Sequence, residues 1–110
     1  MACRGSGRVT VDIDGRDRRL DMVRAVYNIM FHGYMPRVYL TRHGWHIQFI
    51  VSNHSVDDGL YLRSCYGDDS GRLAIDERKH HWGLGELVDT AFEVKVHVDG
   101  KVFRRREIYI

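Results

Sequence analysis

Residues 8–14 alternate strictly between apolar and polar side chains, and this alternation constrains the fold more than any other feature of the chain. Successive side chains of a β-strand point to opposite faces of its sheet. The segment therefore predicts a strand with one apolar face, to be covered by helices, and one acidic face left open. The two sets of positions are Val9, Val11 and Ile13 on the apolar side, and Thr10, Asp12 and Asp14 on the acidic side.

The next segment, residues 18–32, has the spacing of an amphipathic helix. Asp17 is placed to cap its start, Gly33 suits the position after its end, and Pro36 prevents continuation. Apolar residues recur at intervals of three and four, which predicts that they face the core. This stripe consists of Leu20, Val23, Tyr27 and Met30.

Two strands are predicted at residues 37–41 and 45–51, which are rich in β-branched and aromatic residues and are joined by a tight turn. Ser55 is placed to cap a short second helix. Residues 72–76 are expected to form a fourth strand. Trp45 either stacks on a nucleobase or packs at the sheet edge.

The C-terminal part predicts a β-hairpin formed by residues 92–98 and 101–110, because Asp99-Gly100 is a type I′ turn signal. A two-residue turn would place Lys95 opposite Arg104 and Glu93 opposite Arg106. Two interpretations of the basic residues stay open: they follow a nucleic-acid backbone, or they protect an edge strand from aggregation. The basic residues are Lys101, Arg104, Arg105 and Arg106.

The expected element order is βαββαβ followed by a hairpin. With right-handed crossovers, this order gives an RRM-like or ferredoxin-like α+β fold, an antiparallel sheet with helices on one face. Residues 1–7 are expected to be a flexible lead-in, and residues 8–110 a single domain, which suits a chain of 110 residues.

Composition narrows the class of protein further. With 44% hydrophobic and 29% charged residues, the chain can bury a core and is not of a disordered type. No apolar run approaches the ~20 residues of a membrane helix, and the first residues lack the apolar stretch of a signal peptide. We therefore expect a cytoplasmic protein, in a cell or an infected host. A net charge of +2 gives weak support for nucleic-acid binding.

Asp12 and Asp14 form the first group of residues suited to chemistry. Their carboxylates share one face of a strand, and a divalent cation such as Mg²⁺ or Mn²⁺ would offset their repulsion. Phosphoryl-transfer sites hold metal ions with such pairs. The alternative is a solvated Asp-x-Asp pair on an exposed face.

The turn at residues 41–46 is the second group. A small hydroxyl and backbone N–H groups at a glycine turn suit phosphate oxygens, and a histidine can donate to a phosphate. The alternative is an ordinary hairpin connection. The candidate phosphate-binding residues are Thr41, Arg42, His43, Gly44 and His46.

Taken in order, these segments resemble the archaeo-eukaryotic primase and primase-polymerase superfamily. Residues 11–14 look like its hydrophobic-Asp-hydrophobic-Asp strand, residues 33–38 like its Gly-Tyr-x-Pro segment, and residues 41–46 like its Ser-Gly-x-Gly-x-His turn. Residues 75–76 are similar to the later hydrophobic-Asp motif. Two departures are Thr41 in place of serine and a chain shorter than most active members.

The resemblance implies that Asp12, Asp14 and Asp76 bind catalytic metal ions and that His46 contacts the phosphates of a nucleoside triphosphate. The implied function is a minimal primase-polymerase-like domain in DNA replication, of the kind that suits a virus, a plasmid or an archaeal host. Because the chain is short, a second interpretation is a non-catalytic relative that binds DNA, RNA or a replication partner protein.

A third interpretation is a Rep-like nuclease. The segment His46-Ile47-Gln48 fits the His-hydrophobic-Gln pattern of rolling-circle Rep endonucleases, which have a similar core. Such an enzyme needs a tyrosine nucleophile on a later helix, for which Tyr61 or Tyr66 would serve.

Overall fold

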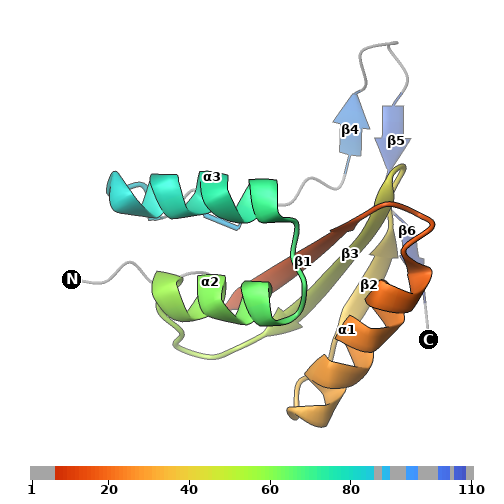
Figure 1. Cartoon of the computed structure of the whole chain (residues 1–110), viewed down its shortest axis with the longest axis horizontal. Coiled ribbons are helices and arrows are strands. Elements are labelled where there is room, and N and C mark those ends of the chain that lie inside the picture. The colour runs from red at the N-terminus through yellow and green to blue at the C-terminus, as the bar shows by residue number, and fades with distance from the viewer. Residues whose placement is uncertain (1–6, 86–87, 90–93, 97–101, 105, 109–110) are drawn as a thin grey trace.

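The computed structural model describes residues 7–85, 88–89, 94–96, 102–104 and 106–108. They form an α+β fold, as predicted (Figure 1). None of the helices among these residues has the length and apolar character of a membrane-spanning segment. The elements in chain order are β1 (Arg8–Asp14), α1 (Arg19–Phe31), β2 (Arg37–Leu40), β3 (Gly44–Ile50), α2 (Val56–Cys65), α3 (Ser70–His81), β4 (Val94–Val96), β5 (Val102–Arg104) and β6 (Arg106–Ile108).

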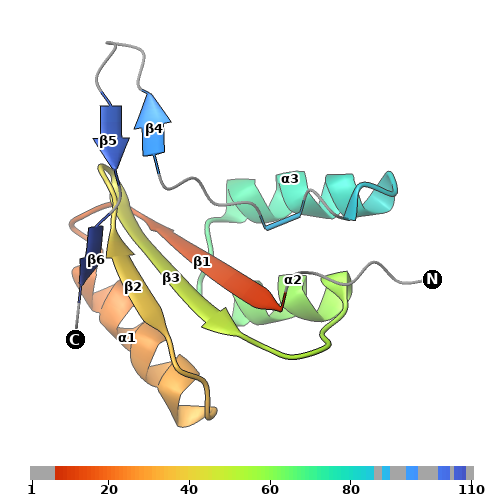
Figure 2. The ribbon, with the colours of Figure 1, turned by 180° about the vertical axis from the view of Figure 1, so that it is seen from behind.

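The main sheet is antiparallel, has four strands and follows the order β1-β3-β2-β6. The first strand, helix and strand pair confirm the elements predicted from alternation and spacing. Ser55 caps α2 as expected, since its side chain accepts a hydrogen bond from Asp58 N–H. Figure 2 shows the sheet from the side opposite α1.

The hydrophobic core lies between α1 and one face of the sheet. The apolar positions of β1 are 0–1% exposed, and α1 covers them with its buried residues Met22, Ala25, Val26 and Ile29. Tyr66, just after α2, also belongs to this core. Trp45 is 9% exposed and packs here as well, so it does not lie on the open face of the sheet.

The prediction that the stripe on α1 faces the core holds for Val23, which packs against it, and was wrong for the other three residues. Leu20 is 74% exposed, Tyr27 60% and Met30 52%. The helix carries apolar residues on two faces, and periodicity alone does not select the face that meets the sheet. The start of the helix also differs, because Arg18 is its N-cap residue and no side chain caps it, including that of Asp17.

Residues 72–76 lie in α3 and not in a strand, so the predicted fourth strand was wrong. Asp69 is the cause at the local level: its side chain accepts a hydrogen bond from Arg72 N–H and caps the helix. Ile75 is 56% exposed.

The C-terminal strands divide between two sheets. β4 pairs with β5, while β6 pairs with β2 at the edge of the main sheet. Lys95 lies opposite Phe103, one residue away from the predicted partner Arg104. The Asp99-Gly100 turn and most of the predicted lead-in lie outside the described residues.

No described strand pairs with the outer edge of β1. Groups from other parts of the chain form hydrogen bonds with its backbone instead. Thr10 and Asp12 direct their backbone groups toward this edge, and all four groups are hydrogen-bonded. The partners are Asp89 Oδ2 for Thr10 N–H (2.8 Å), Arg72 Nη1 for Thr10 C=O (2.9 Å), Asp68 Oδ1 for Asp12 N–H (2.6 Å) and Asp69 N–H for Asp12 C=O (3.0 Å).

Three of these partners, the side chains of Asp68, Arg72 and Asp89, belong to a group of ion pairs that we call the edge network. It is formed by Arg63, Asp68, Arg72, Asp76 and Asp89. Arg63 Nε donates to Asp68 Oδ2 and Arg63 Nη1 to Asp76 Oδ2, both at 2.7 Å. Arg72 Nη1 donates to Asp68 Oδ2 at 2.8 Å, and Arg72 Nη2 to Asp89 Oδ1 at 2.6 Å. The network thus joins α2 and α3 to β1.

Replacing Arg63 with methionine should destabilise the protein by about 3–5 kcal/mol, because Asp68 and Asp76, both buried, lose the guanidinium that pairs with each of them. The Arg63 side chain is only 1% exposed. Urea unfolding followed by circular dichroism measures this change. Arg78→Met on the exposed side of α3 is the control and should change stability by less than about 0.5 kcal/mol. Equal stability of the two variants would contradict a structural role for the network.

Candidate functional site

The pairing of β1 with β3 brings the two predicted motifs together. Asp12 lies directly opposite His46, and Asp14 lies opposite Gly44. Asp12 Oδ1 is 3.5 Å from His46 Nε2. Directly opposite residues of antiparallel strands share a face. The acidic pair and the histidine therefore occupy the sheet face opposite the core.

This face is open only in part. Asp14 is exposed, the Asp12 side chain is 26% exposed, and that of His46 is 7% exposed. Thr10, the third polar position of β1, is fully buried. The expectation of an open acidic face is thus met at the Asp14 end of the strand, where a ligand would have access to the carboxylates.

The turn after β2 is tightly hydrogen-bonded to itself. Thr41 N–H donates to Gly44 C=O at 2.9 Å, and Gly44 N–H donates to Thr41 Oγ1 at 3.0 Å. The Arg16 guanidinium donates to Thr41 C=O at 2.9 and 3.1 Å. The Gly44 N–H is therefore committed within the turn, and the side chains of Arg42 (half-buried) and His43 (exposed) are better placed to meet a phosphate.

Gly44 is required by the closeness of β1. A Cβ atom at this position would collide with the carbonyl oxygen of Ile13, and it would lie 2.9 Å from Gly15 N. The neighbouring Gly15 N–H donates to His43 C=O at 2.6 Å. The absence of a side chain at residue 44 thus lets the acidic strand and the turn lie in contact.

Gly44→Ala should destabilise the protein by about 2–3 kcal/mol, because two backbones must separate to accept the methyl group. Thermal and urea unfolding measure the loss. Gly71→Ala in the first turn of α3 is the matched control. Its Cβ would approach only the Asp69 side chain, at 3.3 Å, so a change below about 1 kcal/mol is expected. A Gly44 variant as stable as the Gly71 variant would show that the close approach is unimportant.

Asp76, the third predicted metal ligand, lies in α3 and belongs to the edge network. Its side chain is 5% exposed, and its Oδ2 accepts hydrogen bonds from Arg63 and from Asp89 N–H (3.1 Å). Within the described part of the chain, no three His, Cys, Asp or Glu side chains gather as a metal site of protein ligands requires. The structure therefore places Asp12 beside His46 and Asp14 on the same face of β1, and it holds Asp76 in the edge network.

Two carboxylates remain a suitable support for a hydrated cation. Mg²⁺ keeps several of its waters and is held by one or two carboxylates together with substrate phosphates. Asp12 and Asp14 present this donor set from one face of β1. These residues thus fit Mg²⁺ or Mn²⁺ bound together with a phosphate ligand.

Sequence reasoning did not identify Asp68. This carboxylate contacts the site through the backbone N–H of Asp12. Burial raises its pKa, although the Arg72 and Arg63 guanidiniums oppose this rise. Both of its oxygens are occupied by hydrogen bonds, including one from Asp12 N–H. A signal was present in the sequence, since Asp68, Arg72 and Asp76 recur at four-residue intervals, as on one face of a helix.

The basic residues near the C-terminus are only partly described. Arg106 is exposed at the start of β6, opposite Leu40 in β2. Arg104 ends β5, opposite Val94 in the smaller sheet. Lys101 and Arg105 lie outside the described residues. Arg104 and Arg106 thus belong to different sheets and not to one continuous strand.

The two tyrosines proposed as nuclease nucleophiles differ in their surroundings. Tyr66 is 6% exposed and its hydroxyl lies 2.6 Å from His32 Nδ1. Burial raises the pKa of Tyr66, which disfavours the phenolate. Tyr61 is 69% exposed on α2. Tyr61 is therefore the accessible candidate for the nuclease hypothesis.

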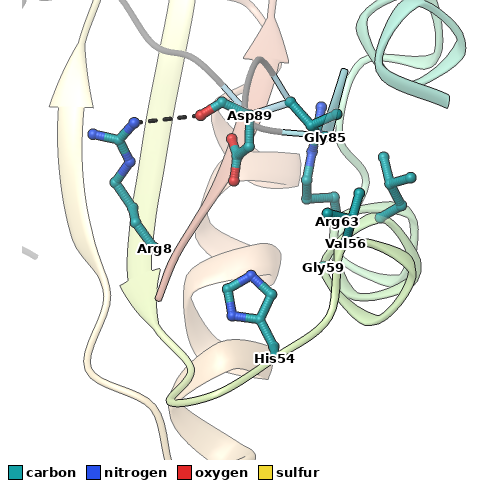
Figure 3. Close-up of a pocket in the computed structure, with 9 residues that line it drawn as sticks. Arg8, His54, Val56, Gly59, Arg63, Gly85 and Asp89 are labelled. Carbon is teal, nitrogen blue, oxygen red and sulfur yellow. Dashed lines mark hydrogen bonds between the residues drawn. The ribbon is translucent and has the colours of Figure 1, made fainter. Parts of the chain in front are cut away.

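A small cavity lies beside the edge network, between Arg8, His54, Arg63 and Asp89 (Figure 3). Arg8 Nη2 donates to Asp89 C=O across its rim at 3.3 Å. The cavity volume of about 30 Å³ suits about two water molecules and is far too small for a nucleotide. This cavity is therefore excluded as a nucleotide site.

Comparison of the chain with family models, with curated proteins and with solved structures finds no match in any of the three. The resemblance to primase-polymerases therefore stays a prediction from the sequence motifs.

Proposed function

We propose that this protein is a minimal primase-polymerase-like domain that binds a nucleoside triphosphate with Mg²⁺ or Mn²⁺ on the sheet face of β1 and β3. The observation that carries the proposal is the register that sets Asp12 opposite His46 and Asp14 opposite Gly44. Two motifs that are about 30 residues apart in the sequence thus meet at one end of the sheet.

The chemistry follows from the side chains in this region. Asp12 and Asp14 would hold the cation, and the cation would bridge phosphate oxygens and offset their charge. His46 Nε2, next to the Asp12 carboxylate, would orient that carboxylate or donate to a phosphate. Arg42 and His43 add donors at the turn, where a triphosphate would extend.

The strand order supports the same proposal. β1-α1-β2-β3-α2 follows the first five elements of a βαββαβ chain, and β3 lies between β1 and β2. We propose that the domain is an RRM-like or ferredoxin-like core in which the edge network occupies the position of the last strand beside β1. DNA replication in a cytoplasmic setting is the role that suits such a core.

Asp12→Asn and Asp14→Asn should each weaken Mn²⁺-dependent ATP binding at least tenfold, because each removes one charged ligand of the cation. Isothermal titration calorimetry with and without EDTA measures this loss. Asp57→Asn is the matched control, since the Asp57 side chain is 80% exposed on α2, and it should leave affinity unchanged. Unaltered binding by both site variants would remove the proposed cation site.

A second candidate function is favoured by the position of Asp76. With this carboxylate held by Arg63, the site has two acidic ligands and lacks the third that the resemblance to active primases implies. The alternative is a non-catalytic relative that binds nucleic acid, alone or with a replication partner protein. Arg104, Arg105, Arg106 and Lys101 would then supply the phosphate contacts.

The two functions predict different results with single-stranded DNA. A non-catalytic module should bind DNA without extending a primer, and its affinity should fall with rising salt. Arg104→Gln combined with Arg106→Gln should weaken this binding and lower the salt slope by about 1.4, at about 0.7 per contact. Arg78→Gln serves as the control. Primer extension that depends on Asp12 would favour the catalytic function instead.

A further inference from the structure

A row of side chains crosses the sheet beside the proposed cation site. Asp12 lies opposite His46, His46 opposite Tyr39, and Tyr39 opposite Glu107. Directly opposite residues of antiparallel strands share a face, so all four lie on the side away from α1. The row therefore leads from the carboxylates of β1 to an aromatic ring on β2.

The ring of Tyr39 is flanked by a fixed cation. Arg37 Nε and Nη2 donate to the two carboxylate oxygens of Glu107 at 2.9 and 2.8 Å. This bidentate pair holds the guanidinium with its Cζ 5.9 Å from the centre of the Tyr39 ring, within cation–π range. The Arg37 side chain is 65% exposed, so a flat ligand can reach the group.

We propose that Tyr39 and Arg37 form a nucleobase platform, and that the base of the nucleotide held at Asp12 and Asp14 stacks there. This inference rests on the proposed function. Neighbouring strands are about 4.8 Å apart, so β1 and β2 place Asp12 and Tyr39 roughly 10 Å apart. That span is comparable to the distance from the phosphates of a nucleotide, across its sugar, to its base.

The pairing register of β2 with β3 identifies Tyr39 as the aromatic ring of the platform. Of the Phe, Tyr and Trp residues in the four strands of the main sheet, only Tyr39 lies on this face, because Trp45 and Phe49 face the core. Bases stack on aromatic rings and on guanidinium planes. Every base has such a flat face, so the platform holds the base of any nucleotide with little discrimination among the four.

The test compares two ligands that share a triphosphate. Tyr39→Ala should weaken binding of Mn²⁺-ATP roughly tenfold or more, and it should leave binding of Mn²⁺-tripolyphosphate, which has no base, unchanged. Tyr39→Phe keeps the ring and should retain ATP affinity within about threefold. Tyr27→Ala, which removes an exposed tyrosine of α1, is the matched control and should change neither affinity.

The outcomes separate the two proposals. If Asp12→Asn abolishes binding of both ligands while Tyr39→Ala changes neither, the platform is refuted and the cation site stands. Equal weakening of both ligands by Tyr39→Ala would assign Tyr39 a structural role and also refutes the platform. If the wild-type protein binds neither ligand, or Asp12→Asn has no effect, the proposed function fails and the platform fails with it.

Discussion

The buried ion pairs of Arg63 are the interaction on which the rest of the structure depends. They link Asp68 and Asp76, and through Asp68 they reach the backbone of β1 at Asp12. Breaking a buried pair is costly, although forming one pays a large desolvation penalty. The raised pKa of Asp68 reflects that penalty. The network therefore acts chiefly by fixing where α2 and α3 meet the edge of the sheet.

That position has a direct consequence for the candidate site. β1 is held on its inner side by seven residue pairs with β3 and on its outer side by the edge network, so the backbone beneath Asp12 is restrained from both directions. A restrained backbone presents its carboxylate in a defined place, which cation binding requires. The same network uses Asp76, and a structural role thus competes with a catalytic role for this residue.

Local patterns allowed β1, α1, β2 and β3 to be predicted, because alternation, helical spacing and tight turns are encoded by neighbouring residues. The register that sets Asp12 opposite His46 came from the structure. Three features depended on distant partners. The sheet buries Met22 and Ile29 and leaves most of the predicted stripe of α1 exposed. Arg63 and β1 stabilise α3 where a strand was expected. The pairing of β4 with β5 is offset by one residue, which moves Lys95 away from Arg104. Tyr39 was not predicted as a site residue, because its register with β3 decides on which face of the sheet its side chain lies.

The central claim is that Asp12 and Asp14 hold a divalent cation on the sheet face. Paramagnetic broadening of backbone amide signals by substoichiometric Mn²⁺, measured by NMR in the presence of a nucleoside triphosphate, tests it most directly. The account predicts the strongest broadening at Asp12, Asp14 and His46, with weak effects at Arg78 and Lys79 in α3. Broadening centred on α3, or none on β1, would contradict it.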